Sequence, residues 1–126
     1  MRRPVSLAEV AAWSESRVSF GGHLSDFLDQ FYSRRRADML AEEPRLLAGR
    51  MDEGDVADAY LATTAVHLSR LIKAVPPAWT RDARRKLHTP WFAGRGSAVR
   101  ATLLAQSPAA FRERNLFVSE NALSRA

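Results

Sequence analysis

Three arginines in the last third of the chain have the spacing of a binding surface. Arg81, Arg84 and Arg85 stand at positions i, i+3 and i+4, and such positions share one face of a helix. A row of guanidinium groups binds phosphates or carboxylates through charge-assisted hydrogen bonds. The spacing therefore predicts contact with an acidic partner, either a nucleic acid or the acidic surface of a protein. A basic face that merely contacts water is the alternative interpretation.

Positive charge is concentrated in the same part of the chain. Residues 1–79 contain ten Lys or Arg and eleven Asp or Glu, a net charge of −1, whereas residues 80–126 contain nine and three, a net charge of +6. Arg112, Arg114 and Arg125 also belong to this basic third. We therefore predict that they contact the same partner as the first three arginines.

Two tryptophans stand beside prolines in this region. Trp79 follows two prolines in PPAWT, and Trp91 follows one in TPWFAG. A tryptophan after a helix stop can pack as a lid on a core, or it can be the centre of a protein interface, where tryptophan and arginine are enriched. Both interpretations stay open at this point, and Trp91 joins the arginines as a candidate partner-binding residue.

No residue spacing in the chain indicates catalysis. His23, His67 and His88 lie far apart in sequence and form no zinc-binding pattern, and the chain has no cysteine. The stretch GRGS at 94–97 lacks the preceding strand and the lysine of a phosphate-binding loop. We therefore expect a protein that is not an enzyme and that uses neither a metal nor a cofactor.

The elements that must position these residues have helical periodicity. Ser6 and Glu9 form a capping-box pattern, so a first helix is predicted to run to about Arg17, and the glycine pair at 21–22 is expected to break the chain. Residues 24–31 have apolar positions at helical spacing and predict a second helix. A long core helix is predicted to begin at Asp52 and to end before the prolines at 76–77.

Shorter helices are predicted beyond those prolines. Thr80 is expected to cap the basic segment RDARRKLH, Ser97 the segment AVRATLLAQ, and the pair Ser107-Pro108 the segment AAFRERN. Residues 116–118, LFV, have the composition of a strand and should pin the tail to the core. The prediction is an all-α fold, a compact single domain spanning 1–126 with five to seven helices and a short extended segment near the C-terminus.

Hydropathy bears on where the protein is expected to act. No apolar run approaches the length of a membrane-spanning helix, and Glu9 interrupts the apolar residues behind the initial arginines, so the start does not read as a signal peptide. These observations favour a cytoplasmic location and predict no membrane contact.

Six segments together resemble a family of small bacterial proteins. In chain order they are LSDFLDQFY, EPRLLAGR, DAYLA, PPAWT, TPWFAG and SPAAFRERNLFVSENALSRA. Genes for such proteins lie beside genes for nucleotidyltransferase-like toxins of the abortive-infection type. Some members also carry an Xre-type helix-turn-helix domain, for which this chain has no pattern ahead of Leu24.

The resemblance implies an antitoxin that binds and restrains its toxin, with the basic C-terminal third as the contact surface. The alternative is a transcriptional regulator that binds nucleic acid through the same basic third. Neither the resemblance nor the residue pattern implies an oligomeric state.

Overall fold

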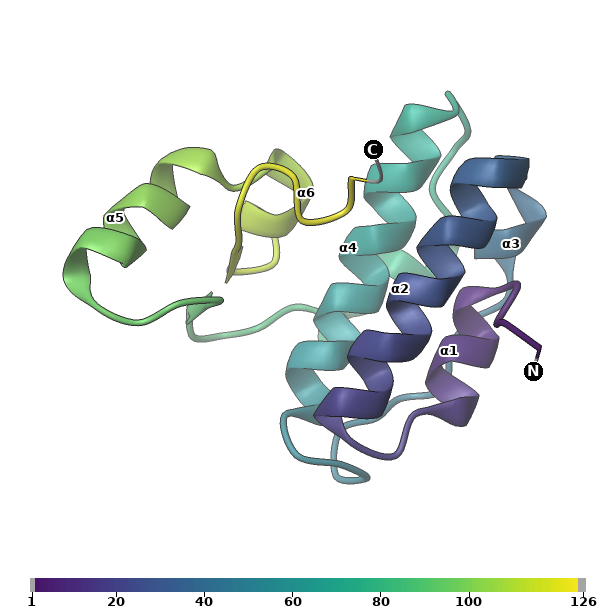
Figure 1. Ribbon diagram of the computed structural model, residues 1–126, viewed down its shortest axis with the longest axis horizontal. Coiled ribbons are helices and arrows are strands. Elements are labelled where there is room, and N and C mark those ends of the chain that lie inside the picture. Colours follow the sequence, from purple (N-terminus) through teal and green to yellow (C-terminus); the bar gives the residue numbers. More distant parts are fainter. Residues whose placement is uncertain (1, 125–126) are drawn as a thin grey trace.

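The computed structural model describes residues 2–124, and within them the fold is all-α (Figure 1). Helix accounts for 55% of the structure and strand for 3%. The predicted fold class is thereby confirmed, including the short extended segment near the C-terminus. The described residues form the helices α1 (Leu7–Trp13), α2 (Arg17–Arg34), α3 (Asp38–Ala41), α4 (Gly54–Leu71), α5 (Ser97–Gln106) and α6 (Ala109–Arg112), the 3-10 turns η1 (Ala78–Arg81) and η2 (Ala83–Arg85), and the strands β1 (Trp91–Phe92) and β2 (Leu116–Phe117).

The boundary between α1 and α2 differs from the prediction. The capping box at Ser6 is present, but α1 ends at Trp13, and α2 then runs straight through the glycine pair at 21–22. A second capping box explains the new start: the Ser16 hydroxyl accepts from the Ser19 backbone N–H at 3.1 Å, and the Ser19 hydroxyl accepts from the Ser16 N–H at 2.9 Å. Burial of the apolar face of α2 outweighs the cost of about 1 kcal/mol for each helical glycine.

The predicted core helix is α4, and it begins two residues later than expected. Asp52 does not cap it; Glu53 occupies the preceding position in the left-handed region, with φ of 54°. Gly54 follows because a Cβ atom there would lie 2.0 Å from the carbonyl oxygen of Leu47. The close approach of the 47–48 backbone therefore fixes both the start of α4 and the identity of its first residue.

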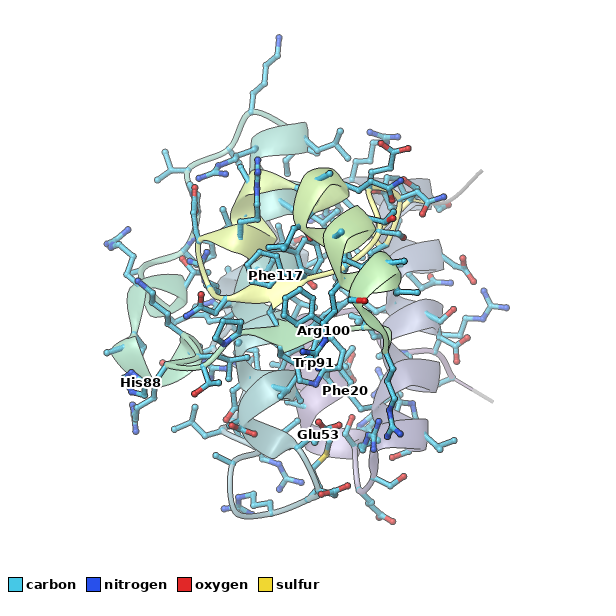
Figure 2. The ribbon with its side chains drawn as sticks, turned by 90° about the vertical axis from the view of Figure 1, so that its left-hand side faces the viewer. Phe20, Glu53, His88, Trp91, Arg100 and Phe117 are labelled. Carbon is cyan, nitrogen blue, oxygen red and sulfur yellow. The ribbon has the colours of Figure 1, made fainter. Side chains whose placement is uncertain are left out.

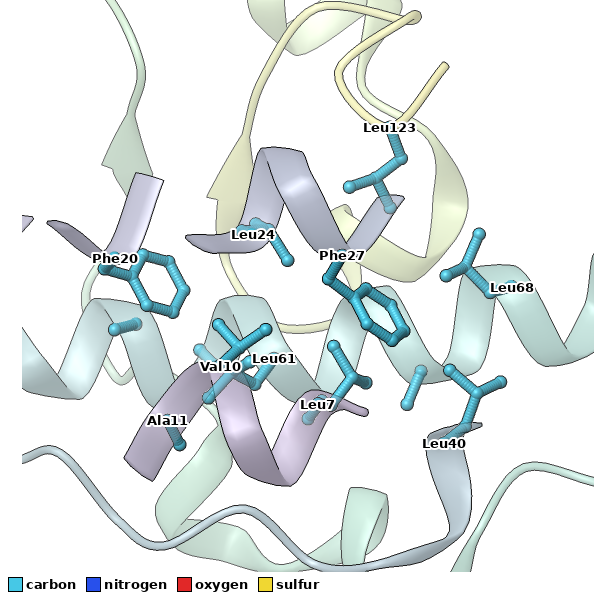
Figure 3. Close-up of a cluster of buried hydrophobic side chains, with 14 of the residues drawn as sticks. Leu7, Val10, Ala11, Phe20, Leu24, Phe27, Leu40, Leu61, Leu68 and Leu123 are labelled. Carbon is cyan, nitrogen blue, oxygen red and sulfur yellow. The ribbon is translucent and has the colours of Figure 1, made fainter. Parts of the chain in front are cut away.

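The core lies between α1, α2 and α4 (Figure 3). Leu7 and Val10 of α1, Phe27 of α2 and Leu61 of α4 are buried there with at most traces of exposed surface. The tail closes one end: Leu123 joins the core cluster, and the Tyr32 hydroxyl donates to its carbonyl oxygen at 2.9 Å.

A two-stranded parallel sheet ties the C-terminal third together. Trp91 and Phe92 of β1 pair with Leu116 and Phe117 of β2. The prediction of an extended segment at 116–118 is confirmed, whereas the pairing with TPWFAG had no sequence signal. Ser107 lies beside β2, but it does not cap α6 as predicted. Its hydroxyl instead donates to the Leu103 carbonyl at 2.7 Å and accepts from the Val118 N–H at 2.8 Å.

None of the helices within residues 2–124 is both long enough and apolar enough to cross a bilayer.

Candidate protein interface

Helix α5 stands apart from the bundle (Figure 1) and exposes apolar side chains to water. All ten of its residues are described, and Leu103 is the buried one. Ala98, Ala101, Leu104 and Ala105 are exposed, and the half-exposed Leu104 retains 49% of its accessible surface. Their spacing places these four residues on one side of the helix. We call them the outer face of α5.

The opposite side of α5 packs on the small sheet. Phe92 and Phe117 stack with their ring centres 4.9 Å apart, and the Arg100 guanidinium lies over the Phe92 ring at 5.1 Å. The chain before α5 is equally close, since a Cβ atom at Gly94 would lie 2.6 Å from a methyl group of Val99. These contacts hold α5 in place, so its outer face is presented on a fixed support.

The outer face is unusual because α5 is apolar on both sides. A helix whose apolar residues surround it is normally buried, whereas a surface helix has a polar outer side. On α5 the sheet covers one apolar side and water the other. This pattern is typical of a helix that docks against another molecule.

The segment that carries α5 is also free of acidic residues. No Asp or Glu occurs between Asp82 and Glu113, while the same stretch contains six Lys or Arg. Among the ion pairs of residues 2–124, none includes Lys86, Arg95 or Arg112, and all three residues are exposed. A partner for the outer face would therefore meet uncompensated positive charge around it.

The predicted row of three arginines does not form. Thr80 starts no α-helix: Arg81 ends η1, and the extended backbone of Asp82 separates it from η2, which contains Arg84 and Arg85. The carboxylate of Asp82 accepts from the Arg84 guanidinium at 2.6 Å, and these hydrogen bonds lower the pKa of Asp82 to about 2. Arg81 is exposed, Arg84 is exposed but paired, and Arg85 is buried.

Arg85 is buried in the protein interior and contacts neighbouring residues of the chain there. Its side chain is 0% exposed, its guanidinium lies 5.0 Å from the centre of the Trp79 ring, and Nη2 donates to the carbonyl of Pro44. The interpretation of Trp79 as a core lid is supported too, because its Nε1 donates to the Leu40 carbonyl at 3.1 Å. Arg85 therefore cannot contact a partner, which corrects the prediction for this residue.

Asp58 of α4 completes this buried cluster. It accepts from the backbone N–H of Leu47 at 2.6 Å and of Ala48 at 3.0 Å, and its Oδ1 lies 4.0 Å from Nη1 of Arg85. Burial raises the pKa of Asp58, against the opposing effects of the two N–H groups and of Arg85. The cluster joins α4, η2 and the 43–48 segment.

The arginines near the C-terminus also separate into two kinds. Arg112 is exposed, whereas the Arg114 side chain is 12% exposed and donates to the Thr80 carbonyl at 3.0 Å. Burial lowers the pKa of Arg114. Arg114, Arg81 and Lys86 line a cleft of 160 Å³, together with Asp82 and Glu113. Arg125 lies outside the described residues.

Trp91 lies in the wall of a larger cleft of about 610 Å³ between α2 and α4. Its Nε1 donates to Glu53 Oε2 at 3.1 Å, and Oε1 of the same carboxylate accepts from Arg17 Nε at 2.9 Å. Figure 2 shows Trp91 between Arg100 of α5 and the pair Phe20 and Glu53. The structure therefore places one predicted residue at a concave surface that adjoins the α5 segment.

The remaining lining of this cleft was not predicted. It includes Val18, Phe20 and Gly21 of α2 and Val56 of α4. Val18 retains 87% of its accessible surface, and a Cβ atom at Gly21 would meet nothing within 4 Å. The sequence predicts a break at the glycine pair, and such a break would remove the α2 wall of the cleft. The cleft forms because α2 continues through both glycines. We call this surface the α2–α4 groove.

The histidines contribute no common site. Within residues 2–124, no group of three or more His, Cys, Asp or Glu residues lies in an arrangement that could hold a metal ion. His23 contacts the edge of the Trp13 ring at 5.8 Å between ring centres. His67 is partly buried, and burial and the nearby Arg70 lower its pKa.

Comparison with known proteins adds nothing to this geometry. We find no protein-family model, curated protein or solved structure that matches the chain.

Proposed function

We propose that this chain is a non-enzymatic interaction protein, an antitoxin that binds and neutralises a co-encoded nucleotidyltransferase-like toxin. The observation that carries the proposal is the outer face of α5, which is apolar, exposed and firmly supported. The resemblance of the sequence supplies the class of partner. On this account the basic C-terminal third contacts the toxin, with α5 at its centre.

The chemistry of the partner agrees with the charge of this segment. Enzymes that transfer nucleotidyl groups bind divalent cations through carboxylates, so their active sites are acidic. The stretch between Asp82 and Glu113 has no acidic residue to repel such a surface. Leu104 would be desolvated at the centre of the contact, and Arg95 and Arg112 would pair with carboxylates at its edge.

Co-expression tests the proposal directly. The toxin is the product of the neighbouring gene, and the wild-type chain is expected to relieve its growth arrest and to co-purify with it. Leu104→Asp should lose both effects, because it puts a carboxylate into an apolar contact that faces acidic residues. Val75→Asp is the matched control, since Val75 is 88% exposed and belongs to the loop after α4, outside the α5 segment. Failure of the wild-type chain to relieve arrest would refute the proposal.

A second candidate is a regulator that binds nucleic acid. It is favoured by the exposed cations Lys86, Arg95 and Arg112, none of which has an ion-pair partner among residues 2–124. Its affinity for promoter DNA would fall steeply with salt, and Arg95→Ala would reduce the salt slope by about 1. A mobility shift of the upstream DNA at two salt concentrations decides this candidate, because an absent or salt-independent shift excludes it.

A further inference from the structure

We propose that the α2–α4 groove receives the outer face of α5 from a second copy of this chain, so that two copies form a reciprocal dimer. Each copy would then supply one helix and one groove. The argument rests on the character of the two surfaces, on their charges and on their connection through Trp91.

The groove has a lining suited to docking a helix. Its volume of about 610 Å³ is enclosed mainly by apolar side chains from two neighbouring helices. An amphipathic helix binds such a groove by inserting apolar side chains at helical spacing. Gly21 contributes to this shape, since the absence of a side chain there leaves the wall open.

The charges at the groove fit α5 better than they fit an acidic partner. Glu53 and Arg17 line the groove, and Arg17 contacts Glu53 at 2.9 Å and Asp52, which lies outside the lining, at 3.8 Å. Two carboxylates against one guanidinium leave a net negative charge there. The α5 segment has no acidic residue and carries the exposed Arg95, whereas Arg100 is turned toward Phe92 of its own copy. Opposite charges would therefore meet when α5 of one copy docks in the groove of the other.

The position of Trp91 makes the exchange geometrically simple. Trp91 belongs to the wall of the groove and also to β1, which leads directly into the α5 segment. In Figure 2, Arg100 of α5, Trp91 and the groove residues Phe20 and Glu53 follow one another across the same view. Two copies related by a two-fold axis can therefore cover both apolar surfaces at once, and such an arrangement closes without further association.

The pair of adjacent glycines in α2 provides a matched test. In Gly21→Trp the indole fills the groove, whereas Gly22→Trp adds the same side chain at an exposed position outside the groove lining. A Cβ atom meets nothing within 4 Å at either glycine, and both changes raise helix propensity, so both variants should fold. Circular dichroism verifies folding before each measurement.

Analytical ultracentrifugation of the purified full chain then measures the monomer–dimer equilibrium. The wild type and Gly22→Trp should dimerise alike, and Gly21→Trp should raise the dissociation constant by roughly tenfold or more. A wild-type chain that stays monomeric at every concentration overturns the proposal. So does a Gly21→Trp variant that dimerises as well as Gly22→Trp, which would indicate contact between the two α5 helices instead.

Cross-linking identifies the two surfaces that meet. Because the chain has no cysteine, Gly21→Cys and Leu104→Cys introduce single thiols, and a short bismaleimide should join the two variants when they are mixed. Gly22→Cys mixed with Leu104→Cys is the control and should give much less product. Equal yields from both mixtures contradict docking of α5 in the groove.

These results are independent of the proposed antitoxin function, because the dimer is measured without the toxin. The toxin and the second copy compete for the outer face of α5, so Gly21→Trp, which leaves that face intact and free of a second copy, should still bind the toxin. Loss of toxin binding in Gly21→Trp, with a monomeric wild-type chain, would instead assign the groove to the toxin and overturn the dimer.

Discussion

Around η2 the chain buries an arginine completely, whereas on α5 it leaves a leucine half exposed. Arg85 is 0% exposed and lies among Trp79, Asp58 and the Pro44 carbonyl, and Leu104 retains 49% of its surface. Both residues belong to the basic third that the charge pattern singles out as one region. Within this basic third, the residue type therefore does not tell which side chain is buried in the structure and which is exposed to a partner. The surroundings of each side chain decide this.

The contrast follows from what each region must satisfy. The 43–48 segment turns two backbone N–H groups and the Pro44 carbonyl into the protein; Asp58 accepts from the N–H groups, and Arg85 donates to the carbonyl. α5 has no such requirement, because its outer face meets only water. An exposed apolar surface of this kind is typical of a contact site for another molecule.

The largest expected effect is at the buried cluster. Asp58→Ala removes the acceptor of two backbone N–H groups and leaves Arg85 without a nearby buried carboxylate, so the free energy of unfolding should fall by about 3–5 kcal/mol. Urea denaturation measures the loss. Arg84→Ala is the control on the same turn and should lower the free energy of unfolding by less than about 1 kcal/mol, because the Arg84 side chain is 67% exposed and its ion pair is screened by water. Equal destabilisation in both variants would remove the distinction between the two regions.

A smaller loss of stability is expected at Ser107, which connects the end of α5 to the chain just after β2. Ser107→Ala leaves the Val118 N–H without its acceptor, and the free energy of unfolding should fall by about 1–3 kcal/mol. The same urea experiment on Ser97→Ala provides the comparison, since Ser97 is exposed at the start of α5. A neutral Ser107→Ala variant would show that the hydroxyl does not anchor β2.

Substitution of Arg114 and of Arg112 should affect different properties, the first stability and the second partner binding. Arg114→Ala removes the bond to the Thr80 carbonyl and should cost about 1 kcal/mol of stability. Arg112→Ala should unfold like the wild type and bind the toxin more weakly, with the difference reduced at high salt. If Arg112→Ala lowers stability as much as Arg114→Ala, Arg112 belongs to the structure and not to the interface.

The smallest effect concerns pH. The folded protein lowers the pKa of His67 below 6.5, so the unfolded chain binds the proton more tightly. Stability should therefore decrease as the pH falls from above 6.5 through the lowered value. His67→Gln should remove this part of the pH dependence in urea titrations. An unchanged profile in the variant would show that other groups cause the decrease.

The sequence predicts the helical core well because its periodicity reports burial along each element. α4 and the apolar face of α2 follow directly from it, and residues 116–118 were predicted as the extended segment. The start of α2 was missed because a Ser16–Ser19 capping box is a weaker sequence signal than a glycine pair. The site was predicted less well, since periodicity and charge do not show which arginine will compensate a buried carboxylate.

The outer face of α5 could have been found from the sequence in part. Ala98, Ala101, Leu104 and Ala105 form one apolar side of AVRATLLAQ and Val99 and Leu103 another, and apolar residues on two sides of a helix predict burial. Only the structure shows that the sheet covers one side and leaves the other exposed. The groove could not be predicted, because it requires residues from α2, α4 and β1 to meet.

The proposed function is tested most directly by the affinity of the purified chain for the proposed toxin, the product of the neighbouring gene. Isothermal titration calorimetry would compare the wild type with Leu104→Asp and Val75→Asp, after circular dichroism has shown that all three are folded. The account predicts wild-type affinity for Val75→Asp and an affinity lower by about 100-fold for Leu104→Asp, the loss expected at the centre of an interface. Equal affinities for the two variants would contradict it.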